Sequence, residues 1–155
     1  MEKTKAHSSR DKVDHQWPKY PLVELVQPFI DVRGSIQPIL DEAIKSAILI
    51  ESNAGSIRAN HYHKTDWHYC YVISGAMEYY HRKTGSEEKP EKIIVNVGNV
   101  VFTPPMVDHA MYFSKDTVFL ALSRNPRDQK SYEEDVVRIE LLSKEGFLNW
   151  RPDDK

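Results

Sequence analysis

Cysteine is nearly absent from this sequence: Cys70 is the single cysteine among 155 residues, so the chain cannot form an internal disulfide. Tyrosines flank Cys70, and this setting indicates a buried structural residue rather than a nucleophile. No apolar run approaches the ~20 residues of a membrane span, and the N-terminal segment lacks the apolar core of a secretory signal. A lone cysteine is typical of a reducing compartment. We therefore expect a cytoplasmic protein with no membrane partner.

An excess of charge of one sign is also missing. The 21 basic and 23 acidic residues give a formal net charge of −2, and lysine and arginine do not cluster. This argues against nucleic acid as the main partner. The length of 155 residues matches one ordinary domain, and there is no internal repeat. Residues 1–17 are polar and charged without an apolar period, so we expect a mobile N-terminal tail there and one domain over residues 18–155.

Short segments rich in Val, Ile, Tyr and Phe follow one another from Pro18 onward, separated by Gly, Pro, Asn, Asp or Ser. These segments are residues 22–32, 35–40, 46–52, 68–74, 76–82, 92–97, 99–104, 110–114 and 117–123. Helical periodicity is weak and limited to residues 40–47 and 132–147. Many short strands at regular spacing predict an all-β domain, a sandwich or a small barrel, with a few short helical segments.

The edges of such a barrel bear on its assembly. Unpaired sheet edges tend to be covered by another chain. Residues 22–30 are apolar enough to pair across a two-fold axis. The sequence therefore predicts a homodimer.

Four of the seven histidines fall into two segments, 55–75 and 98–113. They are His61, His63, His68 and His109. On a strand, alternate side chains share a face, so the first two point the same way. The third opens the next strand after the turn KTDW, and in an antiparallel pair it can lie across from the first two. The fourth can complete the set from a neighbouring strand.

Convergence of four imidazoles inside a barrel has a chemical consequence. The rings would cost much free energy if they were charged and unpaired. Two arrangements remove that cost: a bound transition metal, or neutral rings that hydrogen-bond to a substrate and to one another. An all-imidazole set suits Zn, Ni, Mn, Cu or Fe rather than Mg or Ca. We therefore expect the four histidines to bind one divalent transition ion, with the metal-free set as the alternative. Asp66 and Asp108 lie beside them and fit ordinary turns.

Residues 55–75 resemble the first motif of the cupin superfamily: glycine, five residues, His-x-His, three or four residues, usually glutamate, six residues and glycine. His68 stands where glutamate is usual. Residues 98–113 are similar to the second cupin motif, but Met106 replaces a usual glycine and Phe113 a usual asparagine. The resemblance implies a single-domain cupin, a small jelly-roll β-barrel with its active site inside the barrel mouth. It also implies that the cupin metal ligands map onto the four histidines.

A narrower resemblance is to cupins that remodel nucleotide-linked deoxysugars, the dTDP-4-dehydrorhamnose 3,5-epimerases and the dTDP-4-keto-6-deoxyglucose 3,4-ketoisomerases. Residues 31–35, DVRGS, look like their early D-x-R-G-[SF] signature. Residues 58–63, RANHYH, are similar to their R-G-x-H-x-[HQ] strand, with Ala59 in place of glycine. In that strand the arginine contacts diphosphate and the histidine abstracts a proton, and these enzymes work without metal. The resemblance implies substrate-binding roles for Arg58 and Arg33, although DVRGS also fits a tight turn with a structural salt bridge.

The chemistry of such enzymes requires a base beside the ketone and a donor for the enolate oxygen. We expect His61 to be the base, with His63 or His68 orienting it or protonating the enolate oxygen. Tyr69, Tyr71 and Tyr79 are candidate acids. The sequence thus predicts an isomerase or epimerase of a nucleotide-linked 4-keto-6-deoxysugar. Two alternatives stay open: a transition-metal-dependent cupin of another class, such as a small-molecule dioxygenase or lyase, and a non-catalytic small-molecule-binding cupin.

Overall fold

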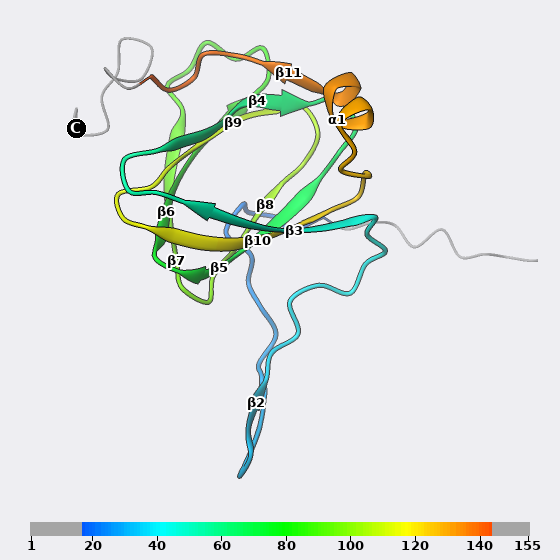
Figure 1. Cartoon of the computed structure of the whole chain (residues 1–155), viewed down its shortest axis with the longest axis vertical. Coiled ribbons are helices and arrows are strands. Elements are labelled where there is room, and N and C mark those ends of the chain that lie inside the picture. Colours follow the sequence, from blue (N-terminus) through cyan, green and yellow to red (C-terminus); the bar gives the residue numbers. More distant parts are fainter. Residues whose placement is uncertain (1–16, 144–155) are drawn as a thin grey trace, which may run out of the picture.

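The structure is a computed structural model that describes residues 17–143. Its elements are β1 (Phe29–Asp31), β2 (Gly34–Ile36), β3 (Ser46–Ser52), β4 (Ile57–His63), β5 (His68–Ser74), β6 (Ala76–Lys83), β7 (Glu91–Asn96), β8 (Val100–Thr103), β9 (Val107–Tyr112), β10 (Thr117–Ser123), α1 (Gln129–Asp135) and β11 (Val136–Arg138). Two antiparallel sheets, ordered β3-β10-β5-β8 and β11-β4-β9-β6-β7, face each other and form a small barrel (Figure 1). This architecture confirms the predicted all-β jelly-roll fold. Except for Trp17, the predicted N-terminal tail lies outside the described residues.

Strand β10 shows how the sequence pattern produces the sheet. Its side chains alternate between buried and half-buried from Thr117 to Ser123, which is the period of a strand with one face toward the core. It pairs with β3 along one edge and with β5 along the other. The predicted segments for all three strands coincide with the observed ones.

An apolar core fills one end of the barrel. Met77 and Phe113 are fully buried between the two sheets. Burying a side chain of this size contributes roughly 1.5–3 kcal/mol. Cys70 belongs to the same buried core, which confirms the predicted burial. Burial raises the pKa of its thiol to about 12. Met111 and Phe119 mark the limit of this core, because they also line the adjoining chamber that holds the histidines.

The predicted helix at residues 40–47 is wrong. Residues 40–45 form no helix, and from Ser46 the chain belongs to β3. Ile39 and Leu40 follow Pro38 and pack as an irregular segment against the cluster of Trp67. This apolar contact holds the segment in an irregular conformation, since tertiary packing overrides a weak helical preference.

The predicted C-terminal helix is correct only in part. Helix α1 begins at Gln129, where Asp128 caps it by accepting a hydrogen bond from the backbone of Ser131, and it ends at Asp135. Val136–Arg138 form β11 instead, because this segment, with two β-branched valines, pairs with the free edge of β4. The end of the predicted segment lies beyond the described residues. No helix between residues 17 and 143 is long and apolar enough to cross a membrane.

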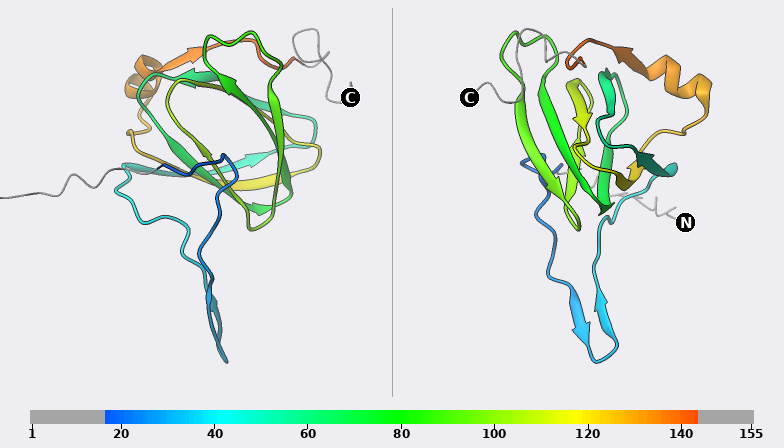
Figure 2. Two further views of the ribbon diagram at one scale, coloured as in Figure 1. Left: turned by 180° about the vertical axis from the view of Figure 1, so that it is seen from behind. Right: turned by 60° about the vertical axis from the view of Figure 1, so that its left-hand side comes forward.

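Strands β1 and β2 form a hairpin that projects away from the barrel (Figures 1 and 2). Of the predicted strand at 22–32, only Phe29–Asp31 is a strand, and Leu22 adds a single bridge to β8. Ile30 and Val32 on the hairpin are exposed. A two-stranded hairpin is marginally stable alone in water. The hairpin therefore presents an apolar surface without a partner in the described part of this chain.

Candidate functional site

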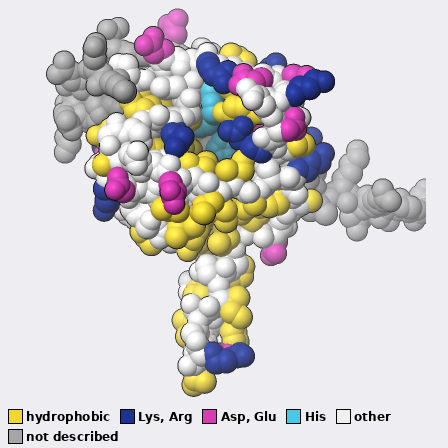
Figure 3. All heavy atoms as spheres, in the orientation of Figure 1, with side chains coloured by type: hydrophobic (Ala, Val, Ile, Leu, Met, Phe, Trp, Pro, Cys, Tyr) yellow, Lys and Arg dark blue, Asp and Glu magenta, His cyan; other side chains and the backbone are white. Residues whose placement is uncertain are grey.

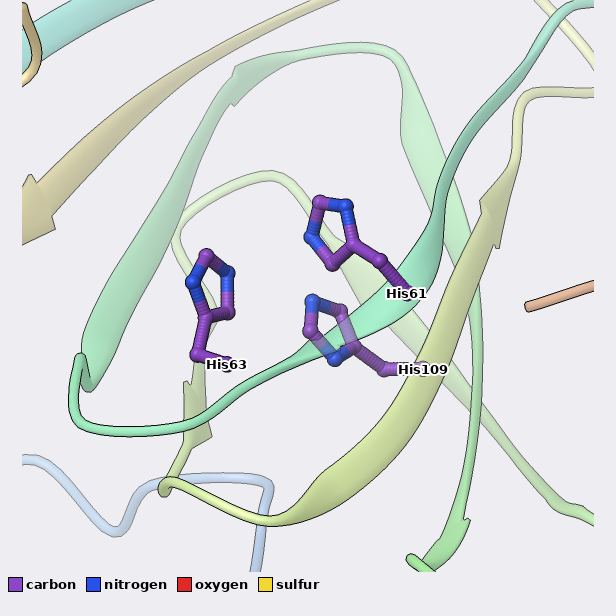
Figure 4. A group of neighbouring side chains, drawn as sticks. All are labelled: His61, His63 and His109. Atoms are coloured by element: carbon purple, nitrogen blue, oxygen red, sulfur yellow. The ribbon is translucent and has the colours of Figure 1, made fainter. Parts of the chain in front are cut away.

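A chamber of about 150 Å³ opens between the two sheets beside the apolar core. All four motif histidines line it, together with apolar side chains of β3, β5 and β10. Figure 4 shows three of the rings, His61, His63 and His109, turned toward one another from β4 and β9. The structure thus brings the four imidazoles together, as their spacing predicted.

The rings lie at short range from one another. The ring centroid of His61 lies 4.7 Å from those of His63 and His109, and that of His68 lies 5.3 Å from the same two. The available nitrogens of His61, His63 and His109 all lie within 4.8 Å of one another. Three imidazoles at this separation can share one ion after small side-chain rotations.

His68 reaches the chamber by a route that differs from the prediction. We expected β4 and β5 to pair, but they belong to different sheets. The short link between them, which includes the buried Asp66 and Trp67, carries the chain from one sheet to the other. His68 therefore faces the other three rings across the barrel interior instead of lying beside them on a paired strand.

A bulge in β4 aims His61 at the chamber. The pairing with β9 shifts by one residue between Ala59 and His61, so that Asn60 is the extra residue. Ala59 and Asn60 both have positive φ, 65° and 55°. The side chain of Asn60 donates to the carbonyl of Leu142 and accepts from its backbone N–H, at 2.8 and 2.9 Å. The bulge thus fixes both His61 and the segment that follows β11.

Asp135 holds His63 in one tautomer. Nδ1 of His63 lies 2.9 Å from Oδ2 of Asp135, and both side chains are buried. Burial raises the pKa of Asp135, but hydrogen bonds from Thr65 and His63 outweigh it and keep the pKa below its ordinary value. An ionised carboxylate can only accept, so Nδ1 carries the proton and Nε2 of His63 keeps its lone pair. No local sequence pattern pointed to Asp135, which β11 brings to the site from 72 residues away.

His109 is held in the same way by a backbone carbonyl. Its Nδ1 donates to the carbonyl of Val107 at 2.9 Å, so its Nε2 also carries a lone pair. That nitrogen is buried and has no hydrogen-bond partner among residues 17–143. A buried polar atom without a partner is costly, which indicates that a ligand or ion contacts it.

Three of the chamber histidines are held in the neutral form. Burial, reinforced by the neighbouring imidazoles, lowers the pKa of His61 to about 2 and that of His68 well below its ordinary value. Burial likewise lowers the pKa of His109 to about 3. Asp66, expected in an ordinary turn, also lines the chamber, and burial raises its pKa. These three imidazoles therefore add no positive charge to the interior, and the carboxylate of Asp135 beside them is already hydrogen-bonded to His63 and Thr65.

The two predicted arginines lie in different places. Arg58 lines the chamber, and its Nε and Nη2 donate to Ser52 Oγ and to the carbonyl of Glu51 on β3 at 2.7 and 2.8 Å. Arg33 lies at the tip of the hairpin, 81% exposed, and pairs with Asp31. The described chain does not place Arg33 at its own chamber, and its contacts fit the tight turn with a salt bridge.

Sequence reasoning missed two chamber residues, Tyr132 and Arg127. The hydroxyl of Tyr132 lies 3.5 Å from Nδ1 of His61, and the guanidinium carbon of Arg127 lies 3.5 Å from the centre of the Tyr132 ring. The three tyrosines considered as acids do not line the chamber. Tyr79 is buried with its hydroxyl on Thr103, and the other two pack in the cluster of Trp67. Tyr132 becomes a candidate acid because α1 lies at the mouth of the barrel. The spacing of residues in the sequence did not indicate that position.

Comparison with known proteins places the fold. No protein-family model and no curated protein matches the sequence. A 3,4-ketoisomerase from Helicobacter canadensis aligns with a TM-score of 0.64 and 18% identity, over 79% of this chain and 92% of that chain. The sugar 3,4-ketoisomerase QdtA from Thermoanaerobacterium thermosaccharolyticum, in complex with TDP, gives 0.62 and 19%, over 77% and 89%. The dTDP-4-dehydrorhamnose 3,5-epimerase from Sulfolobus tokodaii gives 0.57 and 16%, over 71% and 78%. These neighbours match the predicted resemblance, and at such identities they establish that this chain has their fold.

Proposed function

We propose that the protein is an isomerase or epimerase that acts on a nucleotide-linked 4-keto sugar by removing a proton from the carbon beside the ketone. The observation that carries the proposal is the buried His63–Asp135 pair. His63 lines a chamber of the size of one six-membered ring, and its Nε2 is not used by Asp135. The fold neighbours named as 3,4-ketoisomerase and 3,5-epimerase support the same reaction class.

His63 is the base in this proposal. When its Nε2 takes a proton, the carboxylate of Asp135 stabilises the imidazolium that forms. His61, the base expected from the sequence, is less suited to this role because burial lowers its pKa to about 2. Its ring contacts those of both His63 and Tyr132, with centroids 4.7 and 6.1 Å away, so it can orient the substrate.

Tyr132 is the candidate acid. Its half-buried hydroxyl lies at the chamber wall, within 3.5 Å of His61. After the base has taken the carbon-bound proton, negative charge develops on the ketone oxygen, and a phenol can donate to that oxygen. Protonation of the same carbon from the opposite face then completes an epimerisation. Protonation of the former carbonyl carbon instead, with loss of the proton from the neighbouring hydroxyl, completes a ketoisomerisation, and neither outcome changes the net oxidation state.

The test is product formation from a panel of 4-keto nucleotide sugars, followed by NMR. Conversion of at least one, such as dTDP-4-keto-6-deoxyglucose, supports the proposal. Binding without conversion favours the non-catalytic alternative, and neither binding nor conversion removes nucleotide sugars from consideration.

A second candidate is a transition-metal-dependent cupin enzyme of another class. The donor set fits such an ion: three imidazoles have nitrogens within 4.8 Å of one another, and the buried Nε2 of His109 has no described partner. His61, His63 and His109 would hold the ion, with His68 beside them. A divalent ion there would supply Lewis acidity toward a bound carbonyl or oxygen ligand. Elemental analysis of protein purified without added metal tests this, and failure to take up Zn, Ni, Mn, Cu or Fe would exclude it.

A further inference from the structure

Arg127 differs from the other arginines of the described chain. Six arginines lie between residues 17 and 143. Five donate hydrogen bonds to a protein oxygen; they are Arg33, Arg58, Arg82, Arg124 and Arg138. Arg127 alone among the six has no hydrogen bond or ion pair within the described residues, although it lines the chamber. Its guanidinium keeps all its donors for a ligand.

The position of Arg127 is nevertheless fixed. Its guanidinium carbon lies 3.5 Å from the ring centre of Tyr132, and that ring packs edge-on to His61 with centroids 6.1 Å apart. Stacking of a guanidinium on an aromatic face is favourable and leaves its planar N–H fork open. The cation is therefore preorganised at the boundary of the chamber.

The charge of Arg127 is only partly offset by its neighbours. Glu133 lies in the shallow groove next to it, but that carboxylate accepts two hydrogen bonds from Arg138, at 2.7 and 2.8 Å. The carboxylate of Asp135 already accepts hydrogen bonds from Thr65 and His63. Figure 3 shows histidine at the bottom of a hollow whose surroundings carry lysine and arginine. The mouth of the chamber thus favours an anion.

Two hollows meet at Arg127 and Tyr132. One is the histidine chamber, and the other is the groove lined by these two residues with Gln129 and Glu133. A cavity of about 150 Å³ is of the size that holds one six-membered ring. A ligand that occupies both hollows must cross the guanidinium of Arg127.

We propose that Arg127 is an anion-recognition residue that binds a phosphate or diphosphate linking a ring in the chamber to a second group in the groove. Its planar fork can make two parallel hydrogen bonds to phosphate oxygens, which a lysine cannot reproduce. The identity of the ring as a keto sugar rests on the proposed function, whereas the recognition of the anion does not.

The experiment is calorimetric titration of the full chain with inorganic pyrophosphate and with thymidine diphosphate, before and after chelator treatment. Arg127→Gln should weaken both affinities about 10- to 100-fold, the scale of a lost charge-assisted hydrogen bond. Lys130→Gln is the matched control: it removes the same charge from α1 at an exposed residue that lines neither hollow, and it should leave both affinities unchanged.

Three results would overturn the assignment: no binding of either probe by the unaltered protein, equal affinities with and without Arg127, or equal losses in the two variants. The proposed function is judged separately by conversion of keto sugars. Arg127-dependent binding without conversion would keep this inference and remove the isomerase, and conversion with Arg127-independent binding would do the reverse.

Discussion

His63 and Asp135 are 72 residues apart in the sequence, yet Nδ1 of the histidine lies 2.9 Å from Oδ2 of the aspartate. The pair exists because β11 adds to the free edge of β4 and brings the end of α1 to the chamber. Asp135 also accepts from the backbone and hydroxyl of Thr65, both at 2.7 Å. These contacts fix the carboxylate before any substrate arrives.

Asp135→Asn should therefore reduce turnover much more than folding. We expect the rate of proton abstraction to fall by roughly 10²–10⁴-fold, because an amide neither fixes the tautomer of His63 nor stabilises its imidazolium. The free energy of unfolding should fall by about 1–3 kcal/mol for the hydrogen bonds weakened. Asp128→Asn is the matched control, since asparagine caps a helix as well as aspartate does. Equal rates in the two variants would remove Asp135 from the mechanism.

The stability of chelator-treated protein should depend on pH in a defined direction. Burial lowers the pKa values of His61, His68 and His109 below the ordinary 6.5. Below pH 6.5 the unfolded chain takes up protons that the folded chain does not, so stability is full above that pH and falls as the solution is acidified. Asp66, whose pKa burial raises, acts in the opposite sense, but it is one group against three.

Urea titrations between about pH 7.5 and pH 4.5 measure this effect. The midpoint should fall steadily below about pH 6.5, and His109→Asn should reduce the slope because one fewer imidazole titrates in the unfolded chain. A midpoint that does not change over this range would show that the chamber does not exclude protons.

Backbone strain should be relieved at two places where the cupin motifs have glycine. Ala59 and Met106 have φ of 65° and 59°, the left-handed region that costs a non-glycine residue roughly 1 kcal/mol or more. Ala59→Gly and Met106→Gly should each raise the free energy of unfolding by about 0.5–1 kcal/mol. Asn60→Gly should lower it instead, because asparagine tolerates this region and its side chain holds Leu142. Denaturant midpoints measure these changes in stability. Lower stability in both Ala59→Gly and Met106→Gly would contradict the strain argument.

The homodimer stays a prediction, and the hairpin indicates where to test it. Ile30 is 71% exposed on β1, compared with 43% for Ile94 on β7. Ile30→Asp should convert a dimer into a monomer in light scattering at micromolar concentration, because it places a charge in the interface. Ile94→Asp, on the edge strand β7, is the control and should leave the dimer intact. A monomer without any substitution, or dissociation caused by Ile94→Asp alone, would reject this interface.

The parts of the fold that could be predicted are those whose information is local. Short runs rich in Val, Ile, Tyr and Phe between turn residues located β3, β5 and β10, and motif spacing located the four histidines. The parts that could not be predicted depend on which strands pair. Asp135 and Tyr132 come to the site on α1, which β11 follows and anchors by pairing with β4, and the helical pattern at 132–147 concealed that strand.

Solvent-deuterium exchange tests the central claim most directly. The unaltered protein, incubated in D₂O with a 4-keto nucleotide sugar, should incorporate deuterium at the carbon beside the ketone. His63→Gln should abolish this incorporation while nucleotide affinity stays within about threefold, because removal of the base affects the transition state and not the binding of the diphosphate. No incorporation with the unaltered protein across the panel, or undiminished incorporation with His63→Gln, would contradict the account.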